Sequence, residues 1–215
     1  MTDLRIKVSQ NSLGAGGEDT WVAAKGSRLG YQITMDFYTQ MAIEGRVFNT
    51  RAGTIATPFI GDVPVADATA EMSVDAASPT TIIPVYCSIG ITLQPGTANI
   101  YKISSVGAVS TGGDVVVLQN LLIGGEGPVA TATSRADAVG GVTVAAEVIT
   151  TTRLHFAYGN GIVMGAYQSS CEWRPVAPPI LAGPASIYVQ IGATGTGPSY
   201  FMGMEVIVLP TSNID

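Results

Sequence analysis

The chain has 215 residues, of which 47% are hydrophobic and 12% charged, with a net charge of −6. A typical soluble domain has about 25% charged residues, so this chain is expected to bury surface against copies of itself or against a partner. The negative charge and the scattered basic residues argue against nucleic-acid binding, which needs clustered lysines and arginines. No apolar run approaches the ~18 residues of a membrane helix, so we expect no membrane partner.

The first 30 residues are the least regular part of the sequence. Residues 4–8 alternate between apolar and polar side chains, which predicts a short edge strand. Residues 19–26 predict one or two helical turns, with Asp19 or Thr20 as the cap and a glycine as the stop. We therefore interpret residues 1–30 as an N-terminal arm and residues 31–215 as a single β domain.

Residues 80–94 contain the clearest strand pattern in the chain. Apolar side chains fall on every second position, at Ile83, Val85, Cys87, Ile89, Ile91 and Leu93. A period of two predicts that one face of this strand is buried. Its length predicts one long strand bent at Gly90 or two strands broken there, since typical strands have about five or six residues. Pro84 cannot donate to a ladder, which predicts an edge position or a bulge near it.

Strand patterns also dominate the rest of the domain, separated by turns rich in Gly and Pro. A strand or a short helix is expected at residues 37–43, a buried strand at 115–123 and a loop at 130–141. Further strands are expected at residues 31–35, 46–50, 71–74, 100–105, 142–148, 187–191 and 200–209. This pattern predicts an antiparallel, all-β sandwich or barrel. The long connections favour a jelly roll over a simple meander.

Residues able to carry chemistry are few. His155, the one histidine, lies between Leu154 and Phe156 in a predicted strand, with no G-x-S-x-G motif anywhere to supply a nucleophile. We therefore predict no catalytic residue, no metal site and no cofactor. Cys87 is predicted to be a buried free thiol, although a bridge between Cys87 and Cys171 stays open.

Aromatic residues at strand ends suggest contact surfaces. Trp173 and Arg174, with Tyr158 and Tyr167, would make a stacking platform for a sugar or a base, but such aromatics more often cap a core or anchor an interface. In the arm, Trp21 is expected to anchor a neighbouring subunit or a larger shell. The residues predicted to form interfaces are Trp21, Val22, Trp173, Arg174 and Tyr200.

Several short motifs follow one another in a recognisable order. They are Gly30–Thr34, Gly45–Phe48, Pro79–Pro84, Trp173–Pro175, Pro178–Ile180, Gly183–Ile187 and Gly203–Glu205. Over about residues 30–209 this order resembles the jelly-roll virion proteins of tailed bacteriophages, especially capsid cement or decoration proteins. The resemblance implies a non-enzymatic homotrimer that binds the major capsid protein on the exterior of the virion.

Two other functions stay open. A receptor- or glycan-binding module of a tail fibre or spike would share the jelly roll and the trimer. A sugar-processing or metal-dependent enzyme would show a bound metal, or two carboxylates facing each other across a groove.

Overall fold

The structure, a computed structural model, describes residues 5–7, 21–23, 36–63, 68–93, 99–128, 131–137, 141–146, 153–159 and 169–213. These residues form one α-helix, α1 (Phe37–Ile43), and a 3-10 turn, η1 (Thr211–Asn213). The strands are β1 (Arg5–Lys7), β2 (Trp21–Ala23), β3 (Val47–Ala52), β4 (Phe59–Ile60), β5 (Thr69–Ala70), β6 (Met72–Ala76), β7 (Thr80–Leu93), β8 (Asn99–Val106), β9 (Asp114–Val116), β10 (Gln119–Asn120), β11 (Ala132–Ala136), β12 (Val142–Thr143), β13 (Arg153–Gly159), β14 (Ser169–Trp173), β15 (Leu181–Ala182), β16 (Ala185–Ala193) and β17 (Ser199–Pro210).

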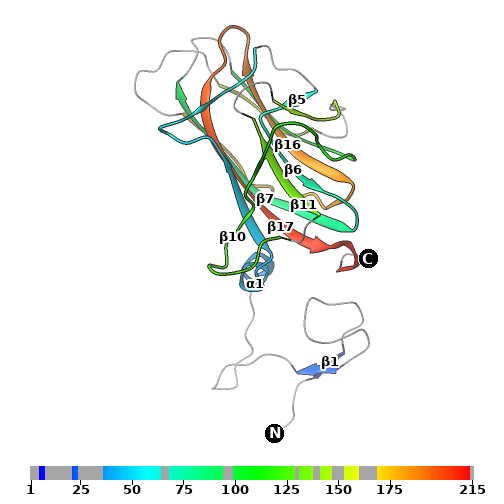
Figure 1. Cartoon of the computed structure of the whole chain (residues 1–215). Coiled ribbons are helices and arrows are strands. Elements are labelled where there is room, and N and C mark those ends of the chain that lie inside the picture. Colours follow the sequence, from blue (N-terminus) through cyan, green and yellow to red (C-terminus); the bar gives the residue numbers. More distant parts are fainter. Residues whose placement is uncertain are drawn as a thin grey trace.

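Two antiparallel sheets form the body (Figure 1). The first sheet has the order β10-β3-β17-β7-β14, with β15 also paired to β7 and β4 to β17. The second sheet has the order β13-β8-β16-β6-β11-β9. Strands β5 and β12 pair with each other, as do β1 and β2. The predicted antiparallel, all-β sandwich is confirmed.

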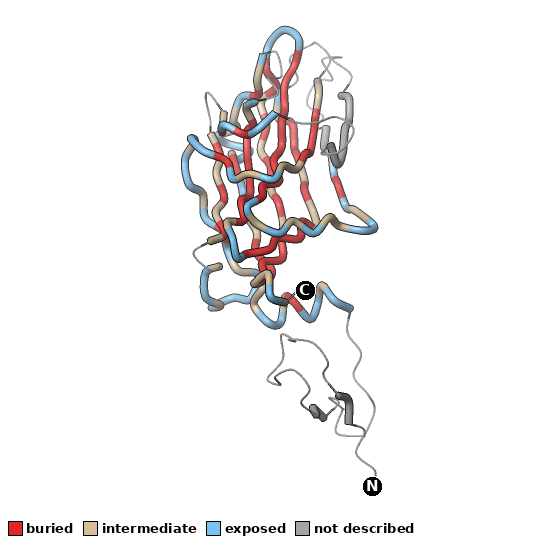
Figure 2. The backbone as a smooth tube through the Cα atoms, turned by 90° about the vertical axis from the view of Figure 1, so that its right-hand side faces the viewer, coloured by how far each residue is buried: buried red, intermediate tan, exposed pale blue. Residues whose placement is uncertain are grey.

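The main core lies between the two sheets, and the buried segments run along the long strands in Figure 2. It takes alternate residues from β3, β7 and β17 on one side and from β6, β8 and β16 on the other. Hydroxyl groups also meet across the sheets, because Thr50 Oγ1 and Ser134 Oγ lie 2.8 Å apart and share a hydrogen bond. A buried hydroxyl pair of this kind satisfies both side chains without water.

Strand β7 is one continuous strand of 14 residues, as predicted, but its apolar side chains do not share one face. In the pairing with β17, Pro84 lies opposite Val206 and Tyr86 lies opposite Glu205, so Val85 is an extra residue in a bulge. A bulge shifts the alternation by one residue. Cys87, Ile89 and Ile91 face the main core. Ile83 and Val85 instead pack with α1 on the other face of the sheet. Leu93 is exposed. The predicted bulge near Pro84 is confirmed, and the prediction of one buried face is wrong.

The prediction of a buried strand at residues 115–123 is wrong. This segment pairs with β11 as β9 and then with β3 as β10, so it passes from the edge of the second sheet to the edge of the first. A strand that changes sheets cannot bury one continuous face. Leu118 is buried. Its apolar neighbours are exposed at Val115, Val117, Leu121, Leu122 and Ile123.

The prediction of a loop at residues 130–141 is also wrong in part. Strand β11 occupies Ala132–Ala136 and alternates between buried and half-buried residues, held between β6 and β9. Its small and polar residues carry little hydrophobic signal, so only the pairing with its neighbours reveals the strand.

In the arm, the predicted strand at residues 4–8 is confirmed as β1. The predicted helix at 19–26 is wrong for Trp21–Ala23, which pairs with β1 as β2. A helix this short has too few hydrogen bonds to offset its nucleation cost, whereas Trp and Val favour strands. Residues 31–35, a predicted strand, lie outside the described residues.

Of the two alternatives at residues 37–43, the helix is correct. Asp36 caps it, because its Oδ1 accepts a hydrogen bond from the Thr39 backbone N–H at 3.0 Å. A side-chain oxygen at this position satisfies one of the N–H groups left free at a helix start. Helix α1 buries Met41 against Val47, Ile83 and Ile207, so it covers one end of the outer face of the first sheet.

Candidate functional site

The rest of that outer face is open. Along one side of β7, β14 pairs with residues 87–91 and β15 pairs with residues 81–82. On this side of β7, between the two partners, no described strand pairs with residues 83–86, and the chain from Arg174 to Ile180 runs past without strand pairing. Pro84 lies in this gap, where no neighbouring strand needs a hydrogen bond from its backbone nitrogen. The gap and the bulge together open the surface beside α1.

Two hollows lie in series on this face. The first, which we call the helix hollow, has a volume of about 660 Å³ and lies between α1 and the chain after β14. The second, the sheet hollow, has a volume of about 400 Å³ and lies over β3, β7 and β17. Tyr86 and Glu205 line both hollows. We therefore regard the two hollows as one groove along the sheet.

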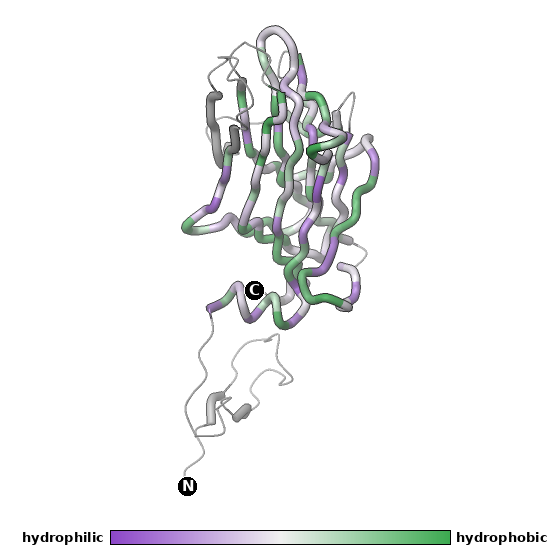
Figure 3. The backbone as a smooth tube through the Cα atoms, turned by 90° about the vertical axis from the view of Figure 1, so that its left-hand side faces the viewer, coloured by the Kyte–Doolittle hydropathy of each residue, from purple (hydrophilic) through white to green (hydrophobic). Residues whose placement is uncertain are grey.

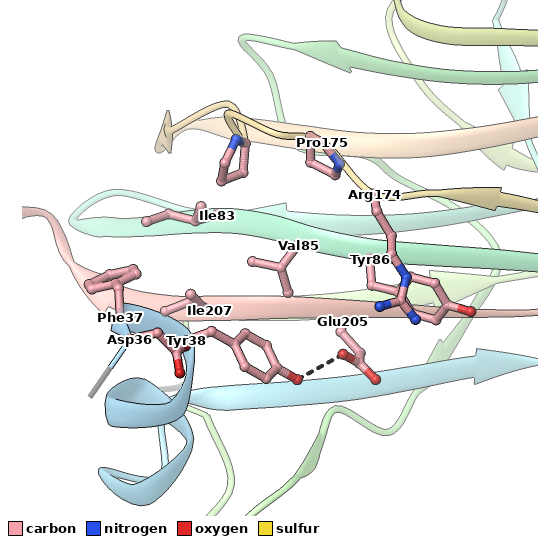
Figure 4. Close-up of a pocket in the computed structure, with 11 residues that line it drawn as sticks. Asp36, Phe37, Tyr38, Ile83, Val85, Tyr86, Arg174, Pro175, Glu205 and Ile207 are labelled. Carbon is pink, nitrogen blue, oxygen red and sulfur yellow. Dashed lines mark hydrogen bonds between the residues drawn. The ribbon is translucent and has the colours of Figure 1, made fainter. Parts of the chain in front are cut away.

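Helix α1 provides one wall of the helix hollow, and Figure 4 shows its side chains pointing toward the sheet. The Tyr38 hydroxyl donates a hydrogen bond of 2.9 Å to Glu205 Oε2. Ile83, Val85 and Ile207 form an apolar floor beneath this pair. The hollow therefore combines an apolar base with a polar rim, as binding sites for small molecules commonly do.

Arg174 forms the opposite wall. Its guanidinium carbon lies 4.4 Å from the centroid of the Tyr86 ring, in the geometry of a cation–π contact (Figure 4). Such a contact orients an arginine while leaving its N–H groups free to bind a ligand. The side chain is exposed, so it presents these donors at the mouth of the hollow.

Asp36 and Tyr38 of the helix hollow are poor candidates for proton transfer. Burial, followed by the hydrogen bond to Glu205, raises the pKa of Tyr38 to about 12, so its hydroxyl stays protonated and donating. Hydrogen bonds from Thr39 lower the pKa of Asp36. A carboxyl that acts as a general acid needs a raised pKa instead. The arrangement is suited to binding a ligand.

The sheet hollow has a different lining. Arg51 and Asn49 project from β3, with Arg51 Nε 3.4 Å from Asn49 Oδ1, and Phe201 comes from β17. Gly203 contributes no side chain at the middle of the hollow. The result is a surface with two aromatic residues, Phe201 and Tyr86, and several planar polar groups.

Of the residues predicted to form interfaces, Arg174 alone is placed at this site. Trp173 and Tyr200 face the main core, with 8% and 0% of their surfaces exposed, so the prediction that their side chains contact a partner is corrected. The alternation along β14 and β17 turns them inward, and position at a strand end does not reveal this. Trp21 and Val22 lie in β2, and their side chains are outside the described part.

Other predicted residues lie elsewhere. His155 is in β13, paired with Ile103, and its side chain is outside the described part. Cys87 is a free, buried thiol, as predicted, and Cys171 is not part of a disulfide. Burial raises the pKa of Cys87 to about 12, which keeps the thiol unreactive. In the described ranges, His, Cys, Asp and Glu side chains form no group of three that would hold a metal ion.

The residues that line the groove carried almost no signal in the sequence. Tyr86 and Glu205 lie about 120 residues apart in the chain and meet only because β7 pairs with β17. Gly203 is a small residue inside a strand pattern, which can mark a place where another molecule approaches closely. Apart from this glycine, the local pattern singled out only Arg174, which was predicted as an interface residue.

The chain matches no protein-family model, no curated protein and no solved structure. Helix α1 has seven residues, and among the described residues no helix is long and apolar enough to cross a membrane.

Proposed function

We propose that this protein is a non-enzymatic structural component of a virion, a homotrimeric cement or decoration protein that binds the exterior of the capsid shell. The strand order supports a jelly roll. In the first sheet, four of the strands lie side by side in the order β3-β17-β7-β14. In the second sheet, the order of the four corresponding strands is β13-β8-β16-β6. Two interleaved four-stranded sets of this kind are what two Greek keys in a double sheet require.

The observation that carries the proposal is a set of exposed apolar side chains at the α1 end, which we call the basal surface. It consists of Phe37, Ile43, Leu122, Ile123, Val176 and Ile180. Ile123 and Val176 are fully exposed, at 99% and 105%. Figure 3 shows hydrophobic segments on the loops at this end.

These residues come from three segments that lie together. The Asn120 side-chain amide donates to the Gly45 carbonyl oxygen at 2.9 Å, which ties the loop of residues 121–128 to the end of α1. At the other end of α1, Phe37 and Pro175 line the helix hollow together. Neighbouring exposed apolar residues indicate a surface that a partner covers. The sequence places the arm of residues 1–30 just before α1, so both would contact the shell.

The proposal is tested with capsids of the encoding virus that lack this protein. Purified wild-type protein is added, and bound copies are counted after sedimentation. An Ile123→Asp, Val176→Asp double variant should lose most binding, because each change places a charge in an apolar contact. Leu93→Asp is the matched control, since Leu93 is 65% exposed and lies at the far end of β7.

Two outcomes would contradict the proposal. Failure of the wild-type protein to bind the capsids would exclude the cement function. Equal loss of binding in the basal variant and in the Leu93→Asp control would exclude the basal surface as the contact. Sedimentation equilibrium of the wild-type protein should show a trimer, and a stable monomer at micromolar concentration would contradict self-association.

A further inference from the structure

The floor of the sheet hollow lacks a side chain where one would fit. A Cβ built on Gly203 would have the Thr50 carbonyl oxygen at 3.6 Å and Ser88 Oγ at 3.7 Å as its nearest neighbours, which are ordinary contacts. Packing therefore does not require a glycine here. Glycine inside a strand costs about 0.5–1 kcal/mol relative to alanine. A glycine that packing does not require indicates that another molecule occupies the space above the strand.

Phe201 lies across the sheet beside this floor. A Cβ built on Gly90, which pairs with Phe201, would lie 2.4 Å from Phe201 Cζ. The far edge of the ring therefore rests on β7, and the half-buried ring forms one side of the hollow. An aromatic ring held in this way offers an apolar surface to a ligand with little loss of side-chain entropy.

Polar side chains with both signs of charge surround the ring. Arg51 supplies only donors, Glu205 supplies only acceptors, and Asn49 and Ser88 supply both. One positive and one negative side chain leave the lining without a net charge. A phosphate ligand would be repelled by Glu205, and a wholly apolar ligand would add no polar partner to Arg51 or Glu205, which already contact Asn49 and Tyr38.

We propose that the sheet hollow binds a neutral carbohydrate. The C–H face of a sugar ring packs on Phe201, and its hydroxyl groups, which both donate and accept, pair with Arg51, Asn49 and Glu205. The Gly203 floor admits the ring close to the strand. An extended peptide is a poorer match, because strand addition needs a free sheet edge and this hollow lies on a sheet face.

The groove also indicates that the ligand is an oligosaccharide and not a single sugar. Tyr86 and Glu205 are shared with the helix hollow, where Arg174 presents further donors. An oligosaccharide chain can therefore extend from the sheet hollow toward α1, so a trisaccharide should bind more tightly than a single sugar. This inference does not depend on the capsid proposal, since the sheet hollow contains no residue of the basal surface.

The test uses the full chain and four probes: maltotriose, cellotriose, mannotriose and tri-N-acetylchitotriose. Saturable binding of at least one of them is expected by titration calorimetry. Gly203→Val fills the floor and should weaken binding by about tenfold or more, because a buried aromatic contact contributes on that scale. Gly203→Ala, whose added Cβ has room, should keep at least the melting temperature of the wild type and shows that a side chain is tolerated at this position.

Phe201→Ala should weaken binding to a similar degree, whereas Val115→Ala should leave it unchanged. Val115 is an exposed apolar residue of β9 in the second sheet that lines neither hollow, so it controls for loss of an exposed apolar side chain. If no probe binds, or if Gly203→Val binds as tightly as the wild type, the proposal is wrong. It is also wrong if Gly203→Val changes the oligomeric state, because the hollow would then be a contact between copies.

Discussion

The two sheets differ in what lies over their outer faces. The outer face of the first sheet is covered by α1 at one end and is hollowed along the rest. The outer face of the second sheet is covered by chain segments 68–70, 107–113 and 141–146, so all nine residues of β16 are buried. Polar residues on the second sheet therefore have structural roles, whereas those on the first remain available to a ligand.

Hydrogen bonds on the covered face show this difference. Ser110 Oγ donates to Asp75 Oδ2 at 2.6 Å and lies 2.7 Å from Ser73 Oγ. Gln190 Nε2 donates to the Thr69 carbonyl oxygen at 2.6 Å. Tyr188 donates to the Ala145 carbonyl oxygen at 3.3 Å. Each bond joins the second sheet to a segment that covers it, and burial makes each costly to lose.

The largest expected difference in stability between the covered and the open face is at Asp75. Asp75→Ala should lower the free energy of unfolding by about 2–3 kcal/mol, because the Ser110 N–H loses its buried acceptor. Glu205→Ala, which removes a carboxylate from the open face, should cost less than about 1 kcal/mol. Urea denaturation of both variants measures the difference. Equal losses would show that the two faces do not differ.

The contribution of Asp75 to the stability of the fold should also depend on pH. Burial raises the pKa of Asp75 above its usual 3.8, despite the hydrogen bonds from Ser110 and the nearby Arg135. The folded state then holds the proton more tightly than the unfolded state does. The stability from this group is thus complete below pH 3.8 and is lost as the pH rises through the folded pKa. Asp75→Asn should remove this part of the pH dependence between pH 3 and 7, and an unchanged melting profile would contradict it.

Two glycines on the open face give the next largest effect. Gly90→Ala should destabilise the protein by on the order of 1–3 kcal/mol, because its Cβ would displace the Phe201 ring. Gly203→Ala should stabilise it by about 0.5 kcal/mol, because a strand alanine loses less entropy on folding. Thermal melts of the two variants compare them directly. Destabilisation by Gly203→Ala would mean that packing does require this glycine.

Tyr38→Phe should have a smaller effect, a loss of about 0.5–1 kcal/mol, because it removes one half-buried hydrogen bond to Glu205. The apolar contact of the Tyr38 ring with the cluster around Met41, Ile83 and Ile207 is kept. Chemical denaturation measures the loss, with Tyr86→Phe as the matched control. A loss above about 2 kcal/mol would show that the open face is as important for stability as the covered one.

Chelator and reductant are expected to have no effect on thermal stability. Together they should leave the melting temperature unchanged, since neither Cys87 nor Cys171 forms a disulfide and the described residues hold no metal-ligand group. Differential scanning calorimetry with and without both reagents measures it. A fall of several degrees with either reagent would reveal a metal or a disulfide.

The sequence by itself determined the all-β class and the long strands. The period-two pattern located β7, β16 and β17, because alternation along one strand is a local property of the chain. Proline chemistry at Pro84 also indicated the bulge correctly. The apolar residues at 37–43 fit neither period clearly, so a short helix, found as α1, was one of the two alternatives predicted there.

Only the tertiary structure decided which face each side chain meets. The bulge at Val85 turns Ile83 away from the core, and crossing between sheets exposes residues 115–123. Trp173 and Arg174 are neighbours in sequence, yet one is in the core and the other in the groove. Which sheet a strand joins, and what covers its outer face, depends on partners tens of residues away. No local pattern of apolar residues contains that information.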